Sequence, residues 1–177
     1  FEKKFGHRDY ATHFGLSHRG VGIEMQPVEN IRPWYREDLP HSTTFDAWGV
    51  GHSKGSEAAF HMTRMHHPLR GERSVEEIRT WPLPRIKETA GEKLRGEVGR
   101  LHARGLAAMG GMACTLWEIG WYLRSMDDLM DDMSNEDERA VIWLDRLTEH
   151  ATERMRLYAK AGCDLVQLGD DIGMQHA

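Results

Sequence analysis

Two adjacent acids, Asp170 and Asp171, directly follow an apolar segment in the sequence DLVQLGDDIGMQ. In parallel α/β folds, functional groups lie at the carboxyl ends of strands, where the loops converge. Neighbouring residues on an extended chain point to opposite sides, so both acids can face one ligand only where the backbone turns. Gly169 and Gly173 permit such a turn. We therefore expect at least one acid, and Asp171 rather than Asp170, to face a pocket. The residues leave open the alternative that one acid caps a helix and the other is solvated.

Other polar residues also follow segments that are expected to be extended. Glu24 ends a predicted strand at 19–25, although a Glu there can simply begin a loop. Asp46, Trp48 and His52 lie among glycines in DAWGVGH. Trp48 can line a pocket or be an ordinary core residue, and the sequence does not decide between these two interpretations.

Metal binding is not favoured by the spacing of the candidate ligands. His61 and His67 would face the same side of a strand but lie too far apart for one ion. The sequence, including the region of His66, contains no HExxH zinc-binding motif. A surface or loop position is the favoured interpretation for all three histidines. Cys114 and Cys163 lack a CxxC spacing, so we expect both to pack as small hydrophobic residues. We predict no zinc site in this chain.

Four acids are concentrated in MDDLMDD, at residues 126–132: Asp127, Asp128, Asp131 and Asp132. Their spacing differs from that of a calcium-binding EF-hand loop. A solvated acidic face before the next helix is the favoured interpretation.

The second half of the chain is expected to alternate helices and strands. Helices are predicted over 86–104 and 114–125, and an apolar strand without alternation over 106–111, which is typical of a strand covered on both faces. A long helix is predicted to begin at a Ser134 cap and to end at Gly162. Its apolar face is Ala140, Leu144, Leu147, Ala151, Met155 and Tyr158. A second buried strand, DLVQLG, follows. Helical crossovers between strands imply a parallel sheet with helices packed outside.

The first half is less regular. A short helical piece is expected within 1–17, and a long irregular excursion over 26–44, which contains three prolines. The segments 44–51 and 58–69 are predicted to be an antiparallel pair with HSKGSE as the turn. A short helix should begin at Ser74, because Ser74 and Glu77 have capping-box spacing, and the prolines after it should end it.

The composition is that of one globular domain covering residues 1–177. Hydrophobic residues make up 40% and charged residues 29% of 177 residues. No run approaches the roughly 18 apolar residues of a membrane helix, so no membrane partner is expected. The net charge is −5 without a basic stripe, which argues against nucleic acid. Two isolated cysteines make a reducing, cytoplasmic setting the default. The chain does not begin with Met, and we interpret it as a piece of a longer protein.

Several segments together resemble the uroporphyrinogen decarboxylase superfamily. The closest similarity is in LDRLTEHATERMRLYAKAGCDLVQLGDDIGMQ, residues 144–175, where the family has a similar helix, an "aGaD" step and a strand that ends in an acid-containing loop. GLAAMGGMACTLWEIGWYLRSMDDLMDD resembles the preceding strand and helix, with Ser125 in place of a family glycine. FDAWGVGHSKG and HPLRGERSVEEIRTWPLP resemble segments of the decarboxylase-like branch.

This resemblance implies an α/β fold of the (β/α)8 TIM-barrel family, with about the first half of the barrel in this chain. The family's two chemistries are decarboxylation of a porphyrinogen without a cofactor and methyl transfer with zinc and a corrinoid. An early family aspartate falls near Glu24, a family serine falls on Asp171, and a pocket tyrosine falls near Ile119 or Tyr122. These departures favour the methyltransferase-like branch, whose His and Cys zinc ligands would lie in the missing half.

The resemblance also implies a site and its partners. The acids Asp171, Asp170 and Glu24 would be catalytic, and a polar substrate would contact Trp48, Trp117, Tyr122 and Gln175. This chain would hold no cofactor itself, while a full-length relative could use zinc and a corrinoid. Expected partners are a small-molecule substrate or a corrinoid carrier. A second copy or the missing half would cover the open sheet edges, and a non-catalytic half barrel that binds a partner is the remaining alternative.

Overall fold

The computed structural model describes residues 2–6, 10–55 and 63–172. Its helices are α1 (Glu2–Phe5), α2 (Tyr10–His13), η1 (Arg32–Trp34), α3 (Val75–Thr80), α4 (Ala90–His102), α5 (Trp117–Arg124), α6 (Met126–Ser134) and α7 (Glu138–Ala161). Its strands are β1 (His18–Val21), β2 (Met25–Gln26), β3 (Thr44–Phe45), β4 (Gly51–Lys54), β5 (Thr63–His66), β6 (Arg85–Ile86), β7 (Ala107–Ala113) and β8 (Leu165–Gly169).

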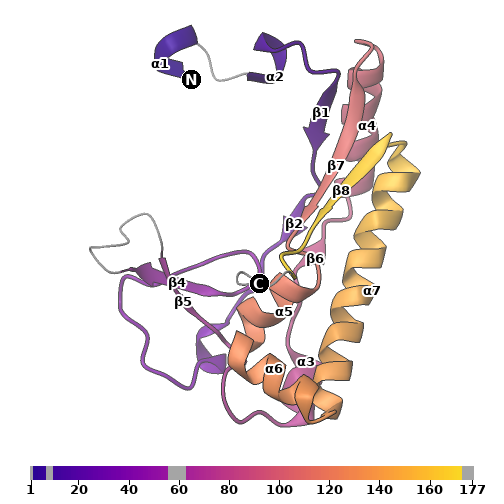
Figure 1. The fold of residues 1–177 in the computed structure, drawn as a ribbon. Helices are drawn as coiled ribbons and strands as arrows, with labels where there is room; N and C mark the ends of the chain where they lie inside the picture. Colours follow the sequence, from indigo (N-terminus) through magenta and orange to yellow (C-terminus); the bar gives the residue numbers. More distant parts are fainter. Residues whose placement is uncertain (1, 7–9, 56–62, 173–177) are drawn as a thin grey trace.

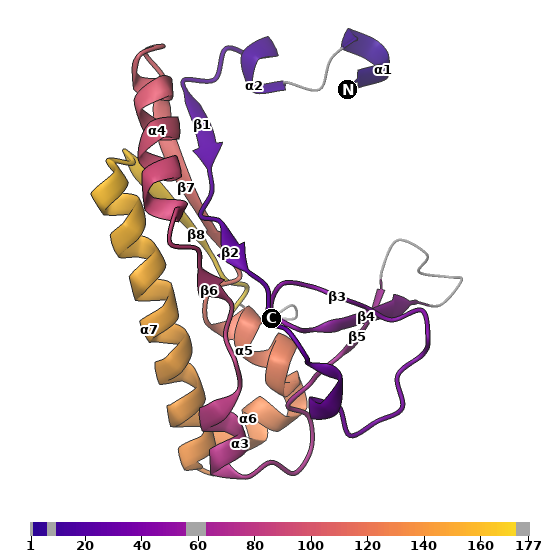
Figure 2. The ribbon, with the colours of Figure 1, turned by 180° about the vertical axis from the view of Figure 1, so that it is seen from behind.

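A parallel sheet of three strands, in the order β1-β7-β8, forms the centre of the fold. Helices α4 and α7 flank it (Figures 1 and 2). The predicted mixed α/β architecture, with a parallel sheet and helices outside, is therefore confirmed. No closed barrel is present in the part of the chain that the structure describes.

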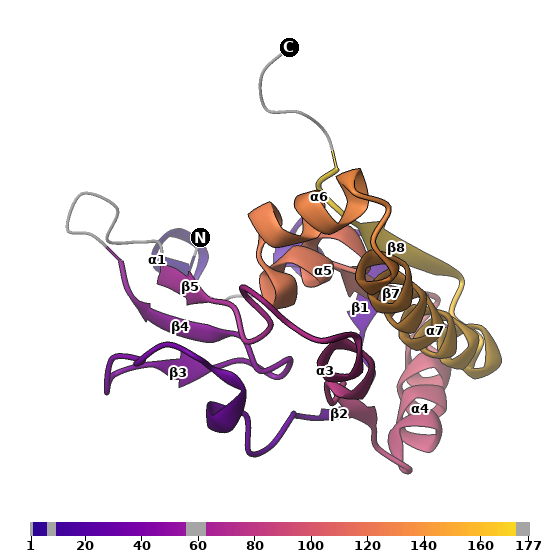
Figure 3. The ribbon, with the colours of Figure 1, turned by 90° about the horizontal axis from the view of Figure 1, so that it is seen from below.

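The region between β1 and β7 forms two small antiparallel sheets. One pairs β2 with β6, and the other has the order β3-β4-β5. The β3-β4-β5 sheet projects to one side of the helices (Figure 3). Segment 44–51 is not one strand as predicted, because the Asp46 carboxylate accepts N–H groups from Trp48 and Val50 and turns the chain between β3 and β4. An antiparallel pair is present, β4 with β5, but residues 52–54 belong to β4 and not to the turn as predicted. The rest of the predicted turn lies partly outside the described residues.

The predicted strand over 19–25 is also interrupted. β1 ends at Val21, and β2 begins at Met25 and pairs with β6 in a different sheet. The chain therefore leaves the parallel sheet before Glu24.

The helix boundaries follow local capping. At α3, Ser74 and Glu77 form the predicted capping box. At α7, the N-cap is Asp137, whose carboxylate accepts the N–H of Arg139, so the predicted Ser134 cap is wrong. Ser134 is instead the last residue of α6. Gly162 ends α7 in the left-handed conformation, with φ of 85°, a region that glycine enters without a steric cost.

The strands are less covered than their sequences predict. β7 is buried on one face, through Ala108, Gly110 and Met112, while Gly111 and Ala113 on the other face are exposed. β8 was expected to be buried, but Leu168 is 55% exposed. Apolar composition predicted the strands correctly, but it could not show that one face of β7 and much of β8 lack a covering element among the described residues.

The expected solvated acidic face is instead part of α6, and one of its acids is buried. Asp132 is 2% exposed and accepts from Arg124 at 2.9 Å and from Arg139 at 3.1 Å. Arg124 is itself buried and also donates to the carbonyls of Leu69 and Gly71. A buried arginine requires such a partner because an unpaired buried charge is costly, and this requirement explains the position of Asp132.

Two apolar clusters stabilise these layers. The larger lies between α3, α5, α6 and α7 and includes Trp81, Leu123, Trp143 and Leu147. The second lies between α4, α7 and the parallel sheet. None of the helices in the described ranges combines the length and apolarity needed to cross a membrane.

Candidate functional site at the ends of the parallel strands

Asp170 follows β8 directly and anchors the start of α5. Its carboxylate accepts the hydroxyl of Thr115 at 2.6 Å and the backbone N–H groups of Leu116, Trp117 and Glu118 at 2.7, 3.2 and 2.9 Å. Partial burial acts to raise the pKa of Asp170, but the Thr115 and backbone hydrogen bonds outweigh it and hold that pKa below its usual value. Asp170 is therefore an ionised anchor that joins the end of β8 to the first turn of α5.

Asp171 lies one residue further along and is arranged differently. The residue is exposed, and its backbone N–H donates to Glu118 Oε2 at 3.3 Å. Its side chain makes no hydrogen bond or ion pair with the rest of the described chain. Asp171 is thus the acid of this pair whose carboxylate is available to a ligand.

Glu118 links the acid loop to two further polar side chains. The hydroxyl of Tyr122 donates to Glu118 Oε1 at 2.9 Å, and Cys114 Sγ lies 4.0 Å from the Tyr122 oxygen. Burial and the neighbouring Glu118 raise the pKa of Tyr122 and of Cys114 above their usual values. At neutral pH Tyr122 is therefore a neutral phenol and Cys114 a neutral thiol.

The sequence interpretation missed Glu118. The available signal was its spacing from Tyr122, since residues four apart on a helix lie on one face, together with its position in the first turn of the helix that follows β7.

Glu24 does not join this cluster. Its carboxylate lies 2.9 Å from Lys93 Nζ on α4 and 3.5 Å from Lys87 Nζ. The hydrogen bond from Lys93 lowers the pKa of Glu24. Glu24 therefore carries a surface ion pair on the helix side of the sheet, and it shares no partner with Asp170 or Asp171.

The aromatic residues expected to line the site are divided between two places. Tyr122 and Trp117 belong to α5, beside the acid loop. Trp48 packs against the larger apolar cluster, and its ring meets that of His150 edge-on, with centroids 5.0 Å apart. The ordinary core interpretation thus describes the position of Trp48. Gln175 lies outside the described residues.

The described histidines are held by hydrogen bonds within the protein. His66 is 4% exposed on β5 and bonds to Ser53 and Glu37, so its expected surface position is wrong. His67 Nδ1 lies 2.8 Å from the carbonyl oxygen of Tyr122. His61 lies outside the described residues. Within the described ranges, no group of three His, Cys, Asp or Glu side chains is arranged to hold a metal ion.

Comparisons with protein-family models, curated proteins and solved structures find no match to this chain.

Proposed function

We propose that this chain is about the first half of a (β/α)8 barrel of the uroporphyrinogen decarboxylase superfamily, and that it serves methyl transfer involving a corrinoid carrier. One observation carries the proposal. The loop that bears the closest sequence resemblance, around Asp170 and Asp171, lies at the carboxyl edge of a parallel sheet and is tied to the start of α5. Barrel enzymes place their reactive groups at this edge.

Each residue of the cluster has a distinct part in this proposal. Asp170 fixes the loop against α5, so that Asp171 is presented from a rigid support. Asp171 binds and orients a polar group of the substrate or of the corrinoid carrier. Glu118 offers a further acceptor, and Tyr122, whose hydroxyl donates to Glu118 Oε1, holds that carboxylate in position.

Zinc does not fit the described part of this chain, because no three ligand side chains converge there. No step of the proposed chemistry is therefore assigned to zinc. A corrinoid would supply the methyl group as a separate carrier, and the residues of this chain would bind and orient both the corrinoid and the molecule that exchanges the methyl group with it.

Decarboxylation of uroporphyrinogen is the second candidate. It is favoured by the two carboxylates of Asp171 and Glu118 at one strand end. In this alternative, a carboxylate stabilises pyrrole N–H groups while positive charge develops on the ring, which requires charge that is oriented before the reaction begins.

A half barrel that binds a partner without catalysis is the third candidate. It is favoured by the apolar side chains that β8 leaves exposed, Leu165 at 43% and Leu168 at 55%. Such residues on an edge strand are typical of a surface that another strand or chain covers.

Ligand binding separates these candidates. The chain should be titrated with methylcobalamin and, separately, with uroporphyrin as the stable oxidised form of the porphyrinogen, and tryptophan fluorescence recorded with correction for ligand absorbance. We expect saturable corrinoid binding that Asp171→Asn weakens about tenfold. Asp127→Asn, which removes an exposed carboxylate on α6, is the matched control and should bind as the wild type does.

Other binding results would support the second or the third candidate function. Porphyrin binding without corrinoid binding would replace methyl transfer with the decarboxylase proposal. Binding of neither ligand, together with a dimer or a larger species in light scattering, would support the partner-binding half barrel.

A further inference from the structure

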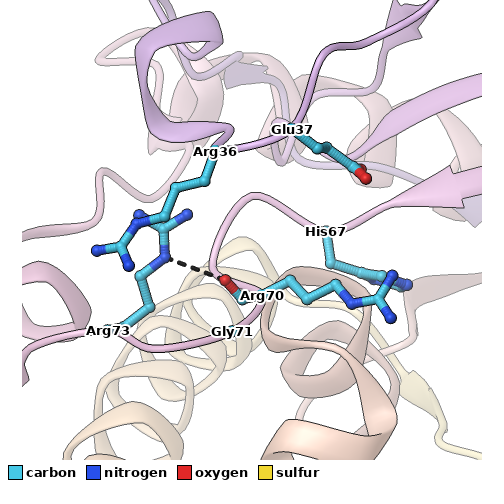
Figure 4. Close-up of a pocket in the computed structure, with 6 residues that line it drawn as sticks. All are labelled: Arg36, Glu37, His67, Arg70, Gly71 and Arg73. Carbon is cyan, nitrogen blue, oxygen red and sulfur yellow. Dashed lines mark hydrogen bonds between the residues drawn. The ribbon is translucent and has the colours of Figure 1, made fainter.

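A cavity of about 270 Å³ lies away from the acid loop, between the segment after η1 and the loop that joins β5 to α3. Its lining residues are Arg36, Glu37, His67, Arg70, Gly71 and Arg73 (Figure 4). Neither the proposed methyl transfer nor the decarboxylase alternative uses it.

Two of the arginines are held in place by other groups. The side chain of Arg73 is 3% exposed and donates to the carbonyls of Trp34 and Pro68 at 2.6 and 2.7 Å. Arg73 and Arg36 both reach Glu77 Oε1 at 2.9 Å, and Arg36 also donates to the carbonyl of Glu72. Glu77 thus holds both guanidinium groups in fixed positions beside the cavity.

Glu37 is held from behind by a buried hydrogen-bond chain. Ser53 Oγ lies 2.9 Å from His66 Nε2, and His66 Nδ1 lies 2.9 Å from Glu37 Oε1. The side chain of Glu37 remains 42% exposed, and its second oxygen has no partner among the described residues. Glu37 therefore offers one oriented acceptor to the cavity.

His67 offers a second acceptor. Its Nδ1 lies 2.8 Å from the carbonyl oxygen of Tyr122, and because a carbonyl only accepts, Nδ1 carries the hydrogen. Burial lowers the pKa of His67, so the ring is neutral at pH 7. Its Nε2 is then an acceptor, and it has no partner in the part of the chain that the structure describes.

Arg70 differs from the other two arginines. Its guanidinium makes no hydrogen bond or ion pair with the described residues. Only its backbone is used: its N–H donates to the carbonyl of His67 at 3.2 Å, and its carbonyl accepts from Arg73 Nε at 3.3 Å. Figure 4 shows its side chain extending beside the ring of His67. Arg36 and Arg73 both pair with Glu77. The nearby Asp128 is already bonded to the N–H of Gly71 and the hydroxyl of Ser125. The charge of Arg70 is therefore left without a direct partner.

We propose that this cavity binds a small molecule in which an anionic group, a carboxylate or a phosphate, stands next to an N–H or O–H donor. Arg70, supported by Arg36, would receive the anionic group, because guanidinium forms strong charge-assisted hydrogen bonds with such oxygens. Glu37 Oε2 and His67 Nε2 would accept from the donor. A bare anion would face the carboxylate of Glu37 without compensation, so both features of the ligand are required.

Four probes test the proposal on the full chain by isothermal titration at constant ionic strength. Lactate and glycerol 3-phosphate carry the anionic group with a neighbouring hydroxyl, while acetate and inorganic phosphate carry the anion alone. We expect at least one hydroxylated probe to bind about tenfold more tightly than its bare counterpart. The pair that shows this difference identifies carboxylate or phosphate as the anionic group.

Three variants locate the binding. Arg70→Gln should weaken the preferred probe about tenfold, and Glu37→Gln should remove the preference for the hydroxylated probe. Arg95→Gln changes an exposed arginine on α4 and should have no effect. Circular dichroism establishes that each variant is folded. The proposal is overturned if none of the four probes binds the wild type, or if Arg70→Gln and Arg95→Gln bind equally well.

Discussion

The ring of Tyr158 occupies the space that a side chain at Gly110 would need. A Cβ built at Gly110 would lie 2.7 Å from the Tyr158 ring, and the Tyr158 hydroxyl donates to the carbonyl of Gly111 at 3.0 Å. This contact packs α7 onto the centre of β7. The absence of a side chain at Gly110 therefore sets how closely helix and sheet approach.

Gly110→Ala should destabilise the fold by about 1–3 kcal/mol, the usual cost of overpacking a filled site. Gly111→Ala is the matched control, because nothing lies within 4 Å of a Cβ at that position. Chemical unfolding of both variants measures the difference. Equal stability of the two would show that the Tyr158 contact does not restrain the sheet.

Asp170→Asn should destabilise the chain by about 1–2 kcal/mol, because the amide replaces one accepting oxygen at a helix start that uses both. Asp171→Asn should change the free energy of unfolding by less than about 0.5 kcal/mol, since its side chain has no partner among the described residues. Thermal and urea unfolding test this contrast, and the reverse order of the two effects would contradict the assigned roles.

Glu77 should make stability depend on acid pH. Its backbone hydrogen bond from Ser74, together with Arg73 and Arg36, lowers the pKa of Glu77 to about 2. A folded-state pKa below the unfolded value of about 4.3 gives stability that is complete above the unfolded value and is lost as pH falls toward 2. The stability difference between wild type and Glu77→Gln should therefore be largest near pH 6 and shrink below pH 4.

Glu76→Gln is the control for this pH dependence. The Glu76 side chain is 68% exposed and pairs only with an exposed arginine, Arg79. Its effect on unfolding should be small at every pH. A Glu77→Gln effect that persists unchanged at pH 2 would contradict the assigned pKa.

Asp132→Asn should be among the most damaging single changes in α6, at about 3–5 kcal/mol, because it removes the buried carboxylate that pairs with Arg124 and Arg139. Only the more distant Asp128 carboxylate, 3.7 Å away, then remains for Arg124. Asp127→Asn, on an exposed turn of the same helix, should be nearly neutral. Urea unfolding of the two variants compares a paired buried acid with a solvated one.

Local patterns in the sequence predicted some element boundaries correctly and others wrongly. Glu77 three residues after Ser74 predicted the start of α3, and Gly162 predicted the end of α7. The start of α7 was predicted wrongly because Ser134 and Asp137 are both good N-cap residues and lie only three positions apart. The side chain that completes the cap depends on how α6 ends, which local sequence does not specify.

The candidate site was less predictable, because its contacts join distant segments. The sequence favoured Asp171 over Asp170 as the acid that faces a pocket, but it did not indicate that Asp170 binds the first turn of α5. Glu24 was grouped with the acids because it follows a predicted strand. Its true neighbours, Lys87 and Lys93, are far along the chain, and nothing in the sequence around Glu24 indicates them.

The position of β1 at the edge of the parallel sheet has a consequence for the order of folding. The long segment that forms the two small sheets separates β1 from its partner β7 along the chain. Strands β7 and β8, in contrast, are joined by three consecutive helices. Closing a long, irregular loop costs more entropy than docking neighbouring elements. The unit from α4 to β8 should therefore assemble first and β1 last. In pulsed hydrogen exchange, the amides of β7 that pair with β8 should gain protection before those of β1, and simultaneous protection would contradict this order.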